Sequence, residues 1–175
     1  MKKLIIGLMA LGLTNLSFSQ VNNNGIAEVE LEGVVITAPN YNYLNEVLDK
    51  NASEKVKDLQ MEVATFNIKN LENYDPEVEK YQVVFNRSNG KVIAIYDNDG
   101  DIESSFERYK NVIVPRKVLS KIFMDHYGWQ LVKDTYQVSY KKDKEVKKVY
   151  KVQLKKGNLK KNLKLDSDGR YIKMS

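Results

Sequence analysis

The chain of 175 residues contains no cysteine and a single histidine. Without cysteine it can form neither disulfides nor thiolate metal sites, and we expect no lipid anchor at a mature N-terminus. A single histidine excludes a His-rich metal site, and the lack of cysteine excludes a cysteine nucleophile. We therefore expect the fold to be stabilised by packing alone.

The short motifs of common enzyme chemistry are also missing. No serine lies in G-x-S-x-G, and there is no P-loop and no G-x-G-x-x-G. His126 lies at the end of a predicted helix, where a packed or capping role is the usual one. Carboxylates are frequent, but the pattern does not single out two of them as an acid/base pair. The sequence predicts no catalytic residue, no metal site and no cofactor.

Two similar acidic stretches, DNDGD at 97–101 and DSDGR at 166–170, raise the question of calcium binding. An EF-hand loop with Gly100 at its sixth position would place Ile95 at position 1 and Phe106 at position 12, where oxygen ligands are required. The second stretch would place Lys164 at position 1. Both stretches are therefore predicted to be tight turns between strands, since Asp-Gly sequences favour positive φ.

The N-terminus is typical of a secretory signal peptide, with Lys2 and Lys3 before an apolar run at residues 4–13. This run is too short to cross a bilayer, which needs about 20 residues. We expect residues 1–20 to be removed near Gln20 and the mature protein to be periplasmic or secreted. Residues 21–40 are predicted to be a leader and an edge strand.

Charge is distributed unevenly along the chain. Residues 133–175 carry 14 Lys and Arg against 5 Asp and Glu, whereas residues 21–132 carry 12 against 18. Such asymmetry concerns partners rather than fold. It indicates either a solvated Lys-rich sheet face or a surface that docks to an anionic partner.

Apolar spacing predicts one helix at 53–66, with Ser53 as its N-cap, and a second at 115–127, beginning at Pro115. In the second helix the predicted buried stripe is Val118, Leu119, Ile122 and Phe123. Residues 29–39 are predicted to be one strand. Alternating residues predict an antiparallel meander after each helix, with a fourth strand at 169–174.

The segments 81–102 and 150–172 match in detail. Each has a Tyr-x-Val strand, a turn containing glycine, and a strand that ends at Asp-x-Asp-Gly. This predicts an α+β fold of two tandem helix-plus-antiparallel-sheet units. The first unit would span residues 41–113 and the second 114–175.

Residues 114–172 resemble the PepSY-like family of exported Bacteroidetes proteins. The resemblance is carried by Val114-Pro115 before a helix, a Tyr-x-Val strand, a glycine turn and the Asp166–Gly169 turn. It implies a fold similar to the β-lactamase-inhibitor protein and a binding or inhibitory role for an open sheet face. It transfers no catalytic residue. Separately, residues 31–38 resemble the short TonB-box segments of outer-membrane receptors, with a structural edge strand as the alternative.

Alternation in the second unit places six lysines on the face opposite Tyr150, Val152 and Leu154. These lysines are Lys141, Lys147, Lys151, Lys155, Lys160 and Lys164. If the second helix covers the apolar face, the basic face is free to bind an acidic protein or an anionic envelope polymer. We expect no specific nucleic-acid binding and no membrane-spanning segment, and the sequence leaves the oligomeric state open.

The alternative is an enzyme that acts on an envelope substrate or a nucleotide. It would be favoured by a cleft between the two units, lined by Asp or Glu and His126. A nicotinate-nucleotide adenylyltransferase would need a His-x-Gly-His motif, whereas Tyr127-Gly128-Trp129 follows His126.

Overall fold

The structure is a computed structural model that describes residues 27–31 and 34–173, with side chains from residue 39 onward. The predicted signal peptide at 1–20 lies outside the described residues. The helices are α1 (Tyr41–Val47), α2 (Glu54–Thr65) and α3 (Arg116–Asp125), with a short 3-10 helix, η1 (Ile68–Asn70). The strands are β1 (Ala27–Leu31), β2 (Val34–Ala38), β3 (Lys80–Arg87), β4 (Gly90–Asp97), β5 (Ile102–Lys110), β6 (Gln130–Lys141), β7 (Lys144–Lys156) and β8 (Leu159–Asp166).

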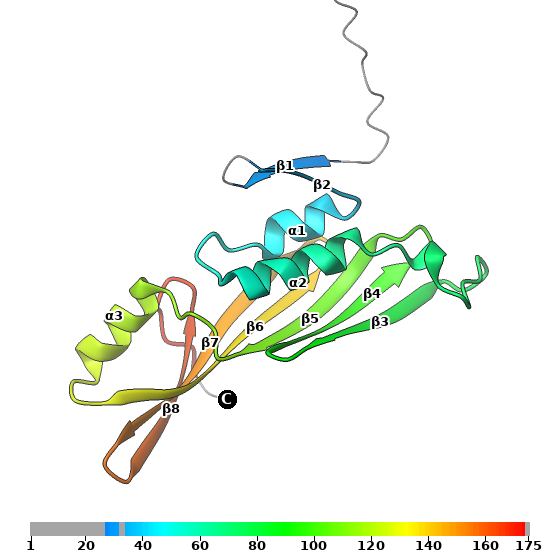
Figure 1. The fold of residues 1–175 in the computed structure, drawn as a ribbon. Coiled ribbons are helices and arrows are strands. Elements are labelled where there is room, and N and C mark those ends of the chain that lie inside the picture. Colours follow the sequence, from blue (N-terminus) through cyan, green and yellow to red (C-terminus); the bar gives the residue numbers. More distant parts are fainter. Residues whose placement is uncertain (1–26, 32–33, 174–175) are drawn as a thin grey trace, which may run out of the picture.

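Strands β3 to β8 form one six-stranded sheet in which each strand pairs antiparallel with the next along the chain. Figure 1 shows α1 and α2 over one face of this sheet and α3 beside its β6–β8 end. The predicted mixed α+β class is therefore confirmed. Because β5 pairs with β6, the two predicted units share one continuous sheet. The tandem duplication and the likeness to the β-lactamase-inhibitor protein stay predictions.

Two strand predictions need correction. The single strand predicted at 29–39 is a pair, β1 and β2, and the pairing of Leu31 with Val34 shows that the chain reverses between them. The strand predicted at 169–174 is reduced to an isolated bridge between Leu165 and Tyr171. Ile172 adds one hydrogen bond to the Lys164 carbonyl.

The helices follow their apolar spacing, with differences at their ends. In α2, Val56, Leu59 and Val63 are buried, as the three- and four-residue spacing predicts. Ser53 occupies the N-cap position, but its side chain makes no capping hydrogen bond. Helix α1, which the sequence analysis missed, has only seven residues, too few for a clear period.

Helix α3 is shorter than predicted and buries a narrower stripe. It begins at Arg116, so that Pro115 is at the N-cap position, and it ends at Asp125. Val118 and Ile122 are buried, but Phe123 is 40% exposed. One side of this short helix, which carries Phe123, is therefore left uncovered.

The core contains a row of tyrosines that crosses the sheet. Register pairs Tyr109 of β5 with Tyr136 of β6, and Tyr136 with Tyr150 of β7. The ring centroids of Tyr136 and Tyr150 lie 4.5 Å apart, and the rings are nearly parallel. Stacked aromatic pairs add about 0.5–1.5 kcal/mol beyond their buried area. This row joins the first three strands to the last three.

Glu107 is a fully buried carboxyl group beneath α1 and α2. Its Oε1 accepts a hydrogen bond from Tyr43 Oη of α1 at 2.8 Å, and its Oε2 accepts one from Gln60 Nε2 of α2 at 2.7 Å. Tyr109 Oη donates a further bond to Oε2 at 2.7 Å, and Ser105 Oγ donates one to Oε1 at 3.3 Å. Burial raises the pKa of Glu107, and the four hydrogen bonds oppose that rise. Both helices are thus attached to β5 through one side chain.

We predict that Tyr43→Phe lowers the free energy of unfolding by about 1–3 kcal/mol, because it removes a donor from a buried carboxyl group. Urea denaturation followed by circular dichroism measures this change. Tyr41→Phe is the matched control, since Tyr41 lies on the same helix and is only half-buried. Its effect is expected to stay within about 0.5 kcal/mol. Equal effects of both variants would contradict the account of Glu107.

The raised pKa of Glu107 predicts a pH dependence of stability. A carboxyl group whose pKa is higher in the folded state stabilises the fold at low pH and loses that contribution as the pH rises through the folded-state value. We therefore compare the free energies of unfolding of the wild type and of Glu107→Gln. The wild-type value minus the variant value should fall as the pH rises above the ordinary pKa of Glu, about 4.3. Denaturation curves at a series of pH values measure this difference. A difference that rises with pH would show that the hydrogen bonds outweigh burial.

Candidate anion-binding surface

The six predicted lysines lie on three neighbouring strands. Lys141 is in β6, Lys147, Lys151 and Lys155 are in β7, and Lys160 and Lys164 are in β8. In β7 the buried residues are Tyr150, Val152 and Leu154, so the odd-numbered residues point to the other face. This open face lies opposite α1 and α2 (Figure 1). Five of the six lysines are exposed and Lys164 is half-buried.

The structure does not bring the six lysines together at one site. Lys147 and Lys155 are separated by eight residues of β7, which is about 26 Å along a strand. Lys147 pairs with Ser139 and lies near one end of the face, whereas Lys155 pairs with Lys160 near the other. Only Lys151 and Lys164 are direct cross-strand partners in the middle of the face.

This middle part of the open face is hollowed into a groove of about 290 Å³. Its charged and polar lining comes from four strands and consists of Arg108, Lys133, Thr135, Lys151, Gln153, Asn162 and Lys164. We call this hollow the basic groove. Among the described residues, no Asp or Glu lines it. Four cations and three neutral hydrogen-bonding side chains thus converge on one shallow surface.

Arg108 and Lys133 were missed by the sequence analysis for different reasons. Arg108 belongs to β5, in the first predicted unit, and reaches the groove because β5 pairs with β6. The alternating residues 135–141 predicted a strand that begins at Thr135, whereas the observed strand begins at Gln130 and includes Lys133. Alternation backwards from Tyr136 would have placed Lys133 on the correct face.

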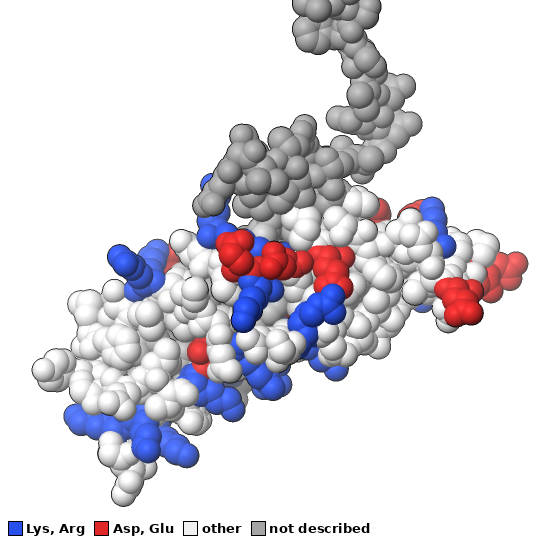
Figure 2. Space-filling model, viewed as in Figure 1, with Lys and Arg blue, Asp and Glu red and all other residues white. Residues whose placement is uncertain are grey.

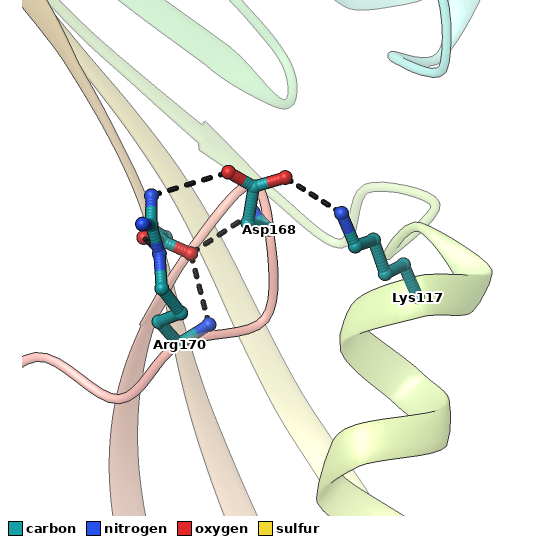
Figure 3. A network of polar contacts seen from close by, with 4 residues as sticks. Lys117, Asp168 and Arg170 are labelled. Atoms are coloured by element: carbon teal, nitrogen blue, oxygen red, sulfur yellow. Dashed lines mark hydrogen bonds and ion pairs between the residues drawn. The ribbon is translucent and has the colours of Figure 1, made fainter.

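The four cations of the basic groove form no ion pair with any residue that the structure describes. The nearby acidic residues of the 166–170 turn are paired elsewhere. Lys117 Nζ lies 2.7 Å from Asp168 Oδ1, and Arg170 Nε lies 2.7 Å from Asp166 Oδ2 (Figure 3). The hydrogen bond and the charge of Lys117 hold the pKa of Asp168 below its ordinary value. Asp166 and Asp168 are therefore already paired with cations outside the groove.

Both Asp-x-Asp-Gly stretches are turns held by their first carboxylate. Asp97 Oδ1 accepts hydrogen bonds from the backbone N–H groups of Asp99, Gly100 and Asp101 at 2.9–3.1 Å. Asp166 Oδ1 accepts from Asp168 and Arg170, both at 2.9 Å. The glycines have φ of 97° and 80°, as turns of this kind require. Across residues 27–31 and 34–173, no group of three or more His, Asp or Glu side chains is placed to hold a metal ion.

A second hollow of about 290 Å³ lies between α2 and the ends of β3, β4 and β5. Its lining carries both signs of charge, including Asp58, Glu62, Arg87 and Lys110, and Arg87 forms an ion pair with Glu62. Its lining is therefore of mixed charge, whereas the charged residues of the basic groove are all cations. His126 lines neither hollow and packs edge-on against Trp129 and Tyr171. Neither hollow is therefore the cleft lined by Asp or Glu and His126 that would favour an enzyme.

Comparison of the chain with models of known protein families, with curated proteins and with solved structures finds no match. The resemblance to PepSY-like proteins stays a prediction from the residues that carry it. Within the described part of the chain, no helix combines the length and the apolar character needed to cross a membrane.

Proposed function

We propose that this protein is an exported, non-catalytic binding module that holds an anionic polymer in the basic groove. The observation that supports the proposal best is the convergence of Arg108, Lys133, Lys151 and Lys164 without a carboxylate partner among the described residues. Cations without a partner at close range carry a field that an anionic ligand can neutralise. Export rests on the predicted signal peptide.

The shape and chemistry of the groove favour an extended chain with repeated anionic groups. It is shallow and crosses β5 to β8, so a ligand could contact several cations in succession. Thr135, Gln153 and Asn162 add neutral side chains that can donate or accept hydrogen bonds. The Gln153 Nε2 already donates to Asn162 Oδ1 at 3.0 Å, which orients both amides across β7 and β8. Phosphate or carboxylate groups along a flexible polymer suit this arrangement.

An acidic protein segment is the other partner that the sequence suggested. It would present carboxylates at the spacing of a peptide backbone, whereas an envelope polymer would present phosphates or uronic carboxylates. Polyglutamate, polyphosphate and a polyuronate serve as probes of these three chemistries. The proposal expects the two polymers to bind more tightly than polyglutamate. Tighter binding of polyglutamate would favour the acidic protein instead.

The test compares two double variants that change the net charge equally. Lys151→Glu with Lys164→Glu alters the groove, and Lys141→Glu with Lys147→Glu alters the same face outside it. We expect the groove variant to weaken polyphosphate binding at least about tenfold, which corresponds to about 1.4 kcal/mol. The control should weaken it by a small factor only, because exposed charges at a distance are screened by salt. Calorimetric titration at two salt concentrations measures both.

Equal weakening by the two variants would show that total charge, and not the groove, governs binding. Binding that does not weaken as the salt concentration rises would also contradict the proposal, since ion release makes such contacts salt-sensitive.

A further inference from the structure

Large apolar side chains are exposed at the end of the molecule that is remote from α1 and α2. Tyr127 is 90% exposed, Met124 is 80% exposed and Leu159 is 65% exposed. Phe123 and Val132 add smaller exposed areas beside them. Single exposed apolar residues are common on proteins, but several large ones at one end indicate an interaction surface.

These residues come from two segments that contact each other. Gln130 of β6 pairs with Lys155 of β7, and the next residue, Lys156, pairs with Leu159 of β8. Lys161 Nζ lies 5.9 Å from the centroid of the Trp129 ring. The end of α3 with the start of β6 (123–132) and the β7–β8 hairpin (155–161) thus form one surface, which we call the tip. Figure 1 shows the hairpin projecting at the end of the sheet.

The tip is strongly basic. Its hairpin contains Lys155, Lys156, Lys160 and Lys161. Its one acidic residue is Asp125, which is paired with Lys121 at 2.9 Å. Figure 2 shows a group of Lys and Arg side chains at this end of the molecule, next to uncharged residues. Lys155 and Lys160, which were predicted to bind a partner with the other four lysines, therefore belong to the tip and not to the basic groove.

We propose that the tip docks on the surface of an anionic phospholipid bilayer. Aromatic and aliphatic side chains insert at the boundary between head groups and acyl chains, while the ammonium groups of neighbouring lysines stay among the anionic head groups. Tyr127, Met124 and Leu159 supply the first kind of contact, and the four hairpin lysines supply the second. A second copy of the chain fits less well, because two such tips would repel each other.

The proposal is independent of the basic groove. The groove binds through charge and hydrogen bonds in the middle of the open face. The tip binds through apolar insertion and charge at the end of the sheet. Docking at the tip would leave Arg108, Lys133, Lys151 and Lys164 accessible to a soluble polymer near the membrane.

Trp129, the single tryptophan of the chain, lies in the tip and reports on docking directly. The experiment adds the full chain to vesicles of phosphatidylglycerol and phosphatidylcholine that carry brominated acyl chains. We expect the fluorescence of Trp129 to shift to the blue and to be quenched, with less effect as the salt concentration rises. Vesicles of phosphatidylcholine alone should quench it little. This readout separates the tip from the apolar segment at residues 4–13, which contains no tryptophan.

Two variants with matched apolar losses test the assignment. Tyr127→Ser with Leu159→Ser removes apolar side chains from the tip, and Val84→Ser with Phe106→Ser removes exposed ones from the open face near β3–β5. We expect the tip variant to need at least about tenfold more lipid for half-maximal quenching. The control variant should behave as the wild type.

Three results would overturn the proposal. They are sedimentation with the vesicles without quenching of Trp129, equal quenching by neutral and anionic vesicles, and unchanged quenching in the tip variant. Lys151→Glu with Lys164→Glu should change quenching by a small factor only, because these residues lie outside the tip and exposed charges at a distance are screened by salt. Failure of the groove and failure of the tip are therefore distinguishable.

Discussion

The pairing of β5 with β6 is the contact on which the rest of this structure depends. It joins the first three strands to the last three and fixes their register from Ser104 to Lys110 of β5. On the covered face it stacks Tyr109 against Tyr136. On the open face it brings Arg108 of an acidic half beside the lysines of a basic half. A shift of one residue would exchange these two faces, because side chains alternate along a strand.

The covered face has its own constraint in Glu107. A carboxyl group buried without hydrogen bonds would destabilise the fold, so the positions of Tyr43, Gln60 and Tyr109 are coupled through it. Two of these donors come from different helices, and their geometry fixes how α1 and α2 lie on the sheet. The open face needs no such network, since water solvates its polar side chains. It is therefore free to carry the charges that a ligand or a bilayer would neutralise.

Much of the fold could be predicted because it rests on local periodicity. The spacing of Val56, Leu59 and Val63 predicted α2, and alternation around Tyr136 and Tyr150 predicted strands and their buried face. Alternation alone does not determine the register between paired strands. The sequence could therefore place six lysines on one face without showing which of them become neighbours. It also could not show that Arg108 joins them. Helix α1 was missed because its seven residues make barely two turns. Glu107 gave no signal because the two donors that come from the helices, Tyr43 and Gln60, are distant from it in the chain.

The central claim is that four cations from β5 to β8 form one anion-binding site, and nuclear magnetic resonance of the backbone amides tests it most directly. A short linear polyphosphate is titrated into the isotope-labelled protein, and the amide shifts are followed along the sheet. The account predicts the largest changes around Arg108, Lys133, Lys151 and Lys164. Changes of similar size around Lys141 and Lys147, or none on the open face, would contradict it.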